Sequence, residues 1–289
     1  MRSTARITAA TVVAGALALG LSACGSSHSG TSSKNDGKAA QDASGPLVVA
    51  ASPTPHAQIL DYVRDHLAKS VGLDLQVKEF SDYVLPNTAT EQGQVGANFF
   101  QHKPYLDDFN KKNGTHLVAV ADVELEPLGL YSHKITALSG LKDGADVAVP
   151  NDTTNEARAL DLLAANGLIT LKAHTEQTAT PADITSNSRH LHFKELEAAQ
   201  LPRSLDDVDA AVINGNYAIE GGLNPAKDAL VIEKAQGNPY ANILVVKQGQ
   251  ENDPRVQKLV KLLDSPQVGQ YIKDTFKGAV IPASGTPAA

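Results

Sequence analysis

Residues 147–158, VAVPNDTTNEAR, decide the fold class, because a strand pattern in them passes directly into a helix pattern. The apolar run at 146–149 is typical of a short buried strand. Thr153, followed three residues later by Glu156, matches a capping box and predicts a helix over 153–166. A strand that leads within a few residues into a helix is the repeating unit of α/β folds.

The same alternation of strand and helix patterns extends to both sides of this stretch. Apolar runs predict further strands at 47–51, 75–80, 95–100, 117–123, 191–196, 210–213, 230–232 and 243–247. Helix patterns occur at 59–71, from Pro104 onward, at 254–263 and at 266–275. This order predicts βαβ units and mostly parallel sheets, and the chain length favours two lobes over a single sheet.

The first residues carry an export pattern. Arg2 and Arg6 precede an apolar stretch, and Leu-Ser-Ala at 21–23 precedes Cys24, the only cysteine of the chain. This layout is typical of a secretory signal peptide, here residues 1–23, and the cysteine resembles the acylated residue of the bacterial lipobox. A spanning anchor is the alternative, but the apolar run at 7–21 is shorter than the roughly 20 residues that a spanning helix needs. We therefore predict lipidation at Cys24 and a lipid-anchored position on the extracytoplasmic side of the cell membrane.

Residues 24–45, which follow the signal peptide, are predicted to be a flexible tether. After the cysteine this segment is rich in Ser and Gly and contains no aromatic or branched aliphatic residue. Such a composition buries too little apolar surface to offset the entropy of ordering the chain. Without Arg2 and Arg6 the chain has 23 basic against 32 acidic residues, a net charge of about -9. This balance argues against a nucleic-acid partner, which would require a basic face.

Motifs for catalysis are missing from the sequence. It contains no GxxxxGK[ST], HExxH or GxSxG run, and no second cysteine that could act as a nucleophile. We therefore predict that the protein is not an enzyme and uses no cofactor. His190 and His192 have a spacing that can bind a metal on one strand face, but a solvated strand face is the favoured interpretation. The scattered histidines, His56 among them, are predicted to lie at the surface.

The helix predicted at 153–166 carries a candidate anion site at its start. Free N–H groups at a helix N-terminus attract anions, and Asn155 lies in the first turn. Arg158 follows three residues later, and its guanidinium can bind a carboxylate through two hydrogen bonds. The residues alone leave two interpretations equally open. Arg158 is either a carboxylate clamp or the partner of Asp161 or Glu156 on a solvated face.

Several short motifs occur in a fixed order along the chain. They are DYVLPN at 82–87, NFFQHKPYL at 98–106, VAVPNDTTNEAR at 147–158, LPRSLDD at 201–207, AVIN at 211–214 with Tyr217, and NPAKD and NPYAN at 224–228 and 238–242. Together they closely resemble the methionine-binding lipoproteins of ABC uptake systems, the NlpA-type family. The resemblance extends from about Leu47 to Gly278.

This resemblance implies an α/β, two-lobed periplasmic-binding-protein fold of type II-like form, with two crossovers and a ligand cleft between the lobes. We expect lobe one at 46–130 plus 241–289, and lobe two at 131–240. The implied function is a solute-binding lipoprotein that captures L-methionine or a close derivative and delivers it to the permease and ATPase of an ABC importer. The resemblance leaves open whether the ligand is L-methionine, D-methionine, a sulfoxide or a methionyl dipeptide.

The resemblance also assigns the pocket residues. The implied pocket wall, whose aromatic rings suit a thioether, comprises Tyr83, Phe100, His102 and Tyr105. Asn155, Arg158 and Asn214 are implied to hold the backbone end of the amino acid. Glu126 is a weaker candidate for the ligand ammonium, and Phe99, on the opposite strand face from Phe100, is predicted to be core.

Two other classes of protein remain as alternatives. A metal-binding lipoprotein would need His102, His190 and His192 to converge. A structural or adhesive lipoprotein would bind no small ligand in a saturable way.

Overall fold

The structure, a computed structural model, describes residues 45–174 and 177–285. The predicted signal peptide, the lipidation at Cys24 and the tether as far as residue 44 lie outside the described residues. None of the helices in the described ranges combines the length and the apolar character that crossing a bilayer requires.

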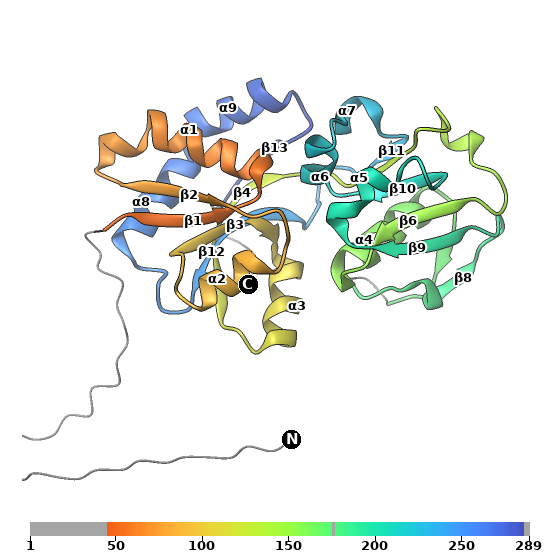
Figure 1. The fold of residues 1–289 in the computed structure, drawn as a ribbon, viewed down its shortest axis with the longest axis horizontal. Coiled ribbons are helices and arrows are strands. Elements are labelled where there is room, and N and C mark those ends of the chain that lie inside the picture. Colours follow the sequence, from red (N-terminus) through yellow and green to blue (C-terminus); the bar gives the residue numbers. More distant parts are fainter. Residues whose placement is uncertain (1–44, 175–176, 286–289) are drawn as a thin grey trace, which may run out of the picture. The chain divides into compact units, whose positions relative to one another are not determined.

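The first sheet has six strands in the order β13-β4-β12-β3-β1-β2 (Figure 1). Its strands are β1 (Leu47–Ala51), β2 (Leu75–Glu79), β3 (Ala97–His102), β4 (Leu117–Leu125), β12 (Ala241–Lys247) and β13 (Ile281–Gly285). One face packs against α1 (Gln58–His66), α8 (Pro254–Leu263) and α9 (Pro266–Phe276). The other face is covered by α2 (Leu85–Glu91) and α3 (Lys103–Asn113).

Alternation along β3 explains how this sheet fills both faces. Phe99 is fully buried among the residues of α1, α8 and α9, as predicted. Phe100 points to the opposite face and packs against α3. Because successive strand residues face opposite sides, a single strand supplies both the main core and the surface that becomes the pocket.

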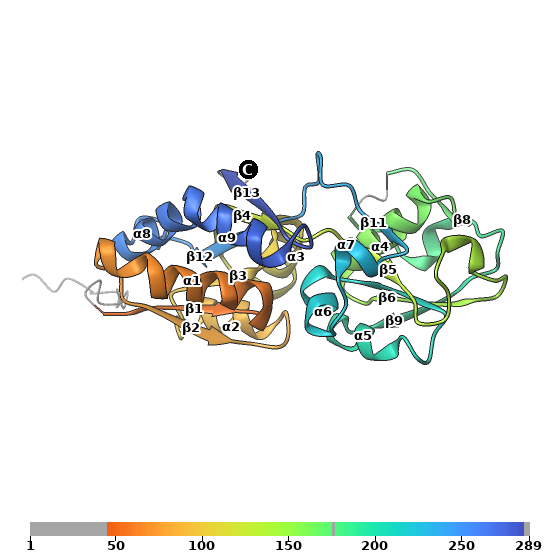
Figure 2. The same cartoon turned by 90° about the horizontal axis from the view of Figure 1, so that it is seen from above.

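The second sheet has five strands in the order β11-β5-β10-β6-β9. Its strands are β5 (Gly129–Tyr131), β6 (Asp146–Pro150), β9 (His192–Leu196), β10 (Ala210–Ile213) and β11 (Val231–Ile232). Helix α4 (Thr153–Ala165) covers one face, while α5 (Leu201–Ser204) and α6 (Gly215–Glu220) cover the other (Figure 2).

Short elements complete the described ranges. Helix α7 is Pro225–Asp228, and β7 (Thr170–Leu171) pairs with β8 (Ile184–Ser186) as a small antiparallel sheet. Single 3-10 or π turns are η1 (Pro53–Ala57), η2 (Ala68–Val71), η3 (Leu138–Gly140), η4 (Pro181–Asp183) and η5 (Ala198–Gln200).

The prediction of mostly parallel sheets is wrong. β1 is parallel to β2 and β3, but β12 is antiparallel to β3 and β4, and β13 is antiparallel to β4. In the second sheet β6 is parallel to β9 and β10, whereas β5 is antiparallel to β10 and β11. The antiparallel pairs involve the strands on either side of each passage between the sheets. Extended segments make those passages, and only a long crossover, usually a helix, returns a strand in the parallel sense.

The molecule therefore has two lobes, each built on one sheet, and the chain passes between the sheets twice. The first passage joins β4 to β5, and the second joins β11 to β12. The first strand of the second sheet begins at Gly129, two residues before the predicted start of lobe two.

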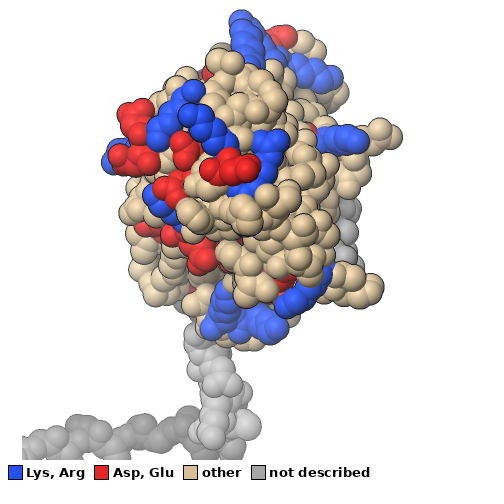
Figure 3. Space-filling model, turned by 90° about the vertical axis from the view of Figure 1, so that its right-hand side faces the viewer, with Lys and Arg blue, Asp and Glu red and all other residues tan. Residues whose placement is uncertain are grey.

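Two features of the second lobe's surface bear on possible partners. β9 begins at His192, and His190 lies outside this strand in a left-handed backbone conformation. The prediction that the two histidines share one strand face is therefore wrong. On the face shown in Figure 3, acidic and basic side chains are interspersed, and no extended basic patch is visible there.

Candidate ligand-binding pocket

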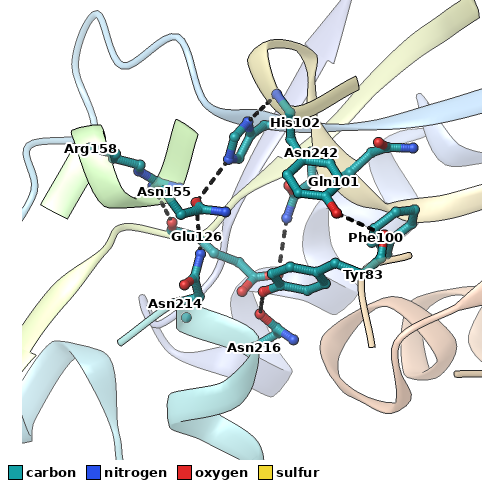
Figure 4. A pocket seen from close by; sticks show the side chains of 12 residues that line it. Tyr83, Phe100, Gln101, His102, Glu126, Asn155, Arg158, Asn214, Asn216 and Asn242 are labelled. Carbon is teal, nitrogen blue, oxygen red and sulfur yellow. Dashed lines mark hydrogen bonds between the residues drawn. The ribbon is translucent and has the colours of Figure 1, made fainter. Parts of the chain in front are cut away.

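One pocket collects all seven predicted ligand residues. Its empty volume is about 340 Å³. Side chains from both lobes line it: Tyr83, Phe100, His102 and Tyr105 from the first lobe, and Asn155, Arg158 and Asn214 from the second (Figure 4). Five further residues line the same pocket, namely Gln101, Glu126, Gly215, Asn216 and Asn242.

The aromatic residues form one wall of the pocket. The ring centroids of Tyr83 and Phe100 lie 5.8 Å apart, and those of Tyr83 and Tyr105 lie 5.7 Å apart, within the range of favourable aromatic pairs. The Tyr105 hydroxyl donates to the Tyr83 carbonyl oxygen at 3.0 Å, which fixes the two rings together. Burial raises the pKa of the Tyr83 hydroxyl well above its usual range, so this wall stays uncharged. It offers an apolar surface to a ligand side chain.

The start of α4 supplies the polar end of the pocket, but its cap differs from the prediction. Asp152, not Thr153, is the N-cap, and its carboxylate accepts from the Asn155 backbone N–H at 3.0 Å. Glu156 does not close a capping box, since its buried Oε1 has no hydrogen-bond partner within the described ranges. Asp152 serves as the N-cap because its carboxylate accepts hydrogen bonds from both the backbone N–H and the side-chain amide of Asn155, each at 3.0 Å.

Asn155 is the centre of a hydrogen-bond network across the pocket. Its Oδ1 accepts from Asn214 Nδ2 at 2.9 Å and faces His102 Nε2 at 3.1 Å, while its Nδ2 donates to Asp152. Both ends of the Asn155 amide are thus engaged by protein. Its position orients His102 and Asn214, which come from different lobes.

His102 is held in one neutral form. Its Nδ1 accepts from the Tyr105 backbone N–H at 3.2 Å and caps α3, so the ring proton belongs on Nε2 and points to Asn155. Burial, and then the nearby positive charge of Arg158, lower the pKa of His102 to about 3. The pocket therefore contains a fixed neutral imidazole at physiological pH.

This depressed pKa predicts that His102 makes the fold less stable in acid. Because its pKa is lower in the folded than in the unfolded chain, the contribution of His102 to stability is fully present above about pH 6.5 and is lost as the pH falls towards 3. The slope contributed by one such group is at most about 1.4 kcal/mol per pH unit. His102→Asn, which keeps an N-cap acceptor but cannot titrate, should give a shallower loss in urea unfolding between pH 4 and 7. Identical slopes in both proteins would contradict this.

Arg158 is buried. Its guanidinium is bound by the carboxylate of Glu233, a residue that was not predicted from the sequence. Only 4% of its side chain is exposed, so the solvated-face alternative is wrong. Its Nε and Nη2 donate to the two carboxylate oxygens of Glu233 at 2.8 and 2.6 Å. Nη2 also donates to the Glu126 carbonyl oxygen at 3.0 Å, and the guanidinium lies 4.3 Å from the ring centroid of Tyr240. Nη1 donates no hydrogen bond to another described residue.

Two asparagines that line the pocket carry unpaired polar atoms. The side-chain Oδ1 of Asn214 and Nδ2 of Asn216 are buried, and neither has a hydrogen-bond partner in the part of the chain that the structure describes. Glu126 shares this corner, and burial followed by the Glu124 carboxylate raises its pKa well above the usual range. A Cβ on Gly215 would lie 2.8 Å from Glu126 Oε2, so the glycine permits this close approach. Because unpaired buried polar groups are costly, these atoms are free to bind a polar group.

Hydrogen bonds between the lobes close the pocket from the aromatic side. The Tyr83 hydroxyl donates to Asn216 Oδ1 at 2.6 Å, and the Tyr217 hydroxyl donates to the Ser81 carbonyl oxygen at 3.0 Å. Both donors are phenols, and each acceptor lies in the opposite lobe. These two hydrogen bonds therefore join the lobes next to the pocket.

Behind the pocket wall lies a buried polar cluster that corrects one prediction. His56, predicted at the surface, is fully buried and lies 3.2 Å from a carboxylate oxygen of both Glu124 and Glu126. Its ring meets the Phe99 ring edge to face at 4.6 Å. The local pattern around His56 gave no signal of burial, because the acids that face it lie about 70 residues further along the chain.

The sequence reasoning missed several pocket residues and the partner of Arg158. Asn216 and Gly215 follow the predicted Asn214 directly, and Asn242 lies in the NPYAN motif, so a signal existed for each. No signal of this kind marked Glu233, which lies 75 residues beyond Arg158. His102, His190 and His192 do not form a metal-binding group among the described residues.

Comparisons with known proteins agree on one family and one fold. The model of the NlpA lipoprotein family matches residues 47–284. The chain is 39% identical over 268 residues to the methionine-binding lipoprotein MetQ of Bacillus subtilis (strain 168), covering 91% of this chain and 94% of that protein.

Two solved structures show the same similarity. A nutrient binding protein from Burkholderia cenocepacia bound to methionine has 43% sequence identity and a TM-score of 0.80, with 82% of this chain and 99% of that chain covered. An ABC transporter, periplasmic substrate-binding protein from Coxiella burnetii has 46% identity and a TM-score of 0.79, with 82% and 100% covered.

Proposed function

Because the chain belongs to the NlpA lipoprotein family, we propose that it captures L-methionine or a close derivative and delivers it to the permease of an ABC importer. The observation that carries the proposal is the division of one pocket into two chemical ends. An uncharged aromatic wall lies at one end, and unpaired polar groups beside Arg158 lie at the other. An amino acid with an apolar, unbranched side chain matches both ends.

The polar end offers a place for each charge of a zwitterion. Arg158 Nη1 and the unpaired Asn216 Nδ2 are donors, which suit the α-carboxylate. Asn214 Oδ1 and the Glu126 carboxylate are acceptors, which suit the α-ammonium. In this proposal Asn155 acts by orienting Asn214 and His102, because protein groups already engage its own amide.

The aromatic end suits a thioether. Sulfur is favourable against aromatic ring edges, by about 0.3–1.5 kcal/mol, and Tyr83, Phe100 and Tyr105 offer three rings.

The proposal is tested by identifying what the protein carries. The full chain, purified without added amino acids and then denatured, should release methionine in near-stoichiometric amount, as measured by mass spectrometry. After refolding free of ligand, calorimetry should give one site for L-methionine. Release of another compound, with no heat from any form of methionine, would refute the assignment.

Membrane anchoring through Cys24 belongs to the same proposal. Cys24→Ala should move the protein from the membrane fraction to the soluble fraction, because one thiol is the only attachment point for lipid in this chain. Affinity for L-methionine should stay unchanged, since the pocket is formed by residues 83–242. Retention of the variant in the membrane fraction after a high-salt wash would instead indicate anchoring by another segment.

Delivery to a permease and its ATPase would use the movement of two lobes, which we place at 46–130 with 241–289 and at 131–240. The two passages between the sheets provide the hinge, and ligand favours the closed form through contacts made by both lobes. In the proposed function the protein binds and releases its ligand without changing it, so no catalytic group is required.

A further inference from the structure

The cluster behind the pocket wall consists of His56, Glu124, Glu126 and Asn242, and we call it the His56 cluster. His56 comes from the turn between β1 and α1, Glu124 from the end of β4, and Asn242 from the facing position on β12. All four side chains are buried. Glu126 and Asn242 also line the ligand pocket, so the open cleft gives the cluster a path to solvent.

The polar atoms of this cluster converge on one point. His56 Nε2 lies 3.2 Å from Glu124 Oε1 and 3.2 Å from Glu126 Oε1. The Asn242 amide nitrogen lies 2.8 Å from Glu124 Oε1, 3.1 Å from Glu126 Oε1 and 3.1 Å from His56 Nε2. Five of the six distances among these four atoms thus lie between 2.8 and 3.2 Å, and the ligand atoms of Glu124 and Glu126 lie within 4.8 Å of each other.

Hydrogen bonding alone does not satisfy this arrangement. An amide nitrogen has two hydrogens, yet Asn242 Nδ2 has three close neighbours, and the contact with His56 brings two nitrogens together. Glu124 Oε2 and His56 Nδ1 are buried and have no partner among the described residues.

The cluster brings two carboxyl groups together. Both lie 3.2 Å from His56 Nε2, and neither forms an ion pair with a lysine or arginine of the described ranges. As carboxylates, the two groups would neutralise a bound cation of charge +2.

We propose that the His56 cluster is a site for a divalent transition-metal cation, with Zn²⁺ the best match. His56 Nε2, Glu124 Oε1 and Glu126 Oε1 are three ligand atoms. Asn242 provides the fourth when its amide turns over to present Oδ1, a rotation that leaves the shape of the side chain unchanged. Zn–N and Zn–O bonds of about 2.0–2.2 Å place the corners of a tetrahedron roughly 3.3–3.6 Å apart, so the five observed distances need to expand by about 0.1–0.8 Å when a cation enters.

The donor set fits this class of cation. One imidazole with carboxylate and amide oxygens suits Zn²⁺ and Mn²⁺, whereas the four close corners disfavour Ca²⁺, which takes six to eight oxygens at longer distances. The site is separate from the proposed amino-acid site, and only the side chains of Glu126 and Asn242 contact both. A bound cation would tie β4 and β12 to the turn after β1.

The test uses the full chain in detergent, stripped with a chelator and dialysed against Zn²⁺ alone. Elemental mass spectrometry should find one zinc per chain, and zinc should raise the melting temperature. Glu124→Gln and His56→Gln should each weaken zinc binding at least about a hundredfold, since even residues that only support a ligand cost 10- to 100-fold. His192→Ala is the matched control, because this exposed histidine lies beside an acid, Asp146, at 3.6 Å, and its loss should change nothing.

X-ray absorption on the zinc-loaded wild type gives a readout that does not depend on any variant folding. It should show one imidazole and three oxygens at about 2.0–2.2 Å. If the wild type does not retain zinc, the proposal is wrong, and bound protons balance the charge of the carboxyl groups in the cluster. Undiminished zinc binding by Glu124→Gln, or loss of zinc in His192→Ala, would also overturn it and point to a surface site. Calorimetry with L-methionine on the same samples tests the amino-acid site separately.

Discussion

Arg158→Ala should weaken L-methionine binding by roughly 30- to 4,000-fold, which corresponds to the 2–5 kcal/mol lost when one partner of a buried charge pair is removed. Arg158 lines the pocket, and its Nε and Nη2 are held by Glu233, so we expect Nη1 to be the donor to the ligand. The alanine variant removes the only arginine that lines the pocket. Calorimetry at constant pH and salt measures the loss.

A double variant separates binding from folding. Arg158→Ala alone leaves the Glu233 carboxylate buried without its partner, a change that typically destabilises a fold by about 3–5 kcal/mol. Arg158→Ala with Glu233→Gln removes that orphaned charge, so we expect stability to recover in urea unfolding while methionine binding does not. Recovery of binding in the double variant would show that Arg158 supports the fold and does not contact the ligand.

Arg158→Lys should fail for a different reason. Lysine is a point charge without a planar fork, so it cannot hold Glu233 through two hydrogen bonds and also present a third donor to the ligand. The two-pronged contact that was predicted for a ligand is made with Glu233. We predict that the ligand contacts the remaining nitrogen of the guanidinium.

Glutamate should bind at least about a thousandfold more weakly than methionine, because its side-chain carboxylate would be buried against three aromatic rings without a partner. Norleucine, which has a methylene in place of the sulfur, should bind within about tenfold of methionine, since it loses only the sulfur–ring contact. Competition against labelled L-methionine measures both ratios. Equal binding of glutamate and methionine would disprove the assignment of Tyr83, Phe100 and Tyr105 to the side-chain slot.

Two phenylalanine variants test the same slot. Phe100→Ala removes a ring that lines the pocket and should weaken methionine and norleucine together, by about 10- to 100-fold for an apolar contact of 1.5–3 kcal/mol. Phe109→Ala is the matched control, because Phe109 is buried in the same cluster and stacks on Tyr105 but does not line the pocket. It should lower stability without changing the ratio between ligands.

The sequence by itself determined many of the helices and strands and seven of the twelve residues that line the pocket. The strands at 47–51 and 210–213 and the helix at 254–263 were predicted with the bounds that the structure has. Apolar periodicity carries this information because it is a property of neighbouring residues. Through the family resemblance, the motifs predicted seven ligand residues, and the structure places all seven in one pocket. Their contacts with a ligand stay predictions.

Only the tertiary structure decided how these parts face one another. The mixed strand directions, the burial of His56 and the pairing of Arg158 with Glu233 each depend on segments far apart along the chain. A buried charge or imidazole needs a partner that offsets the cost of its burial. Here the partner lies far along the chain and comes near only when the fold packs, so no local pattern indicates the contact. The sequence thus specified which side chains are available, and the packing of the two lobes specified which atoms remain free for a ligand or a cation.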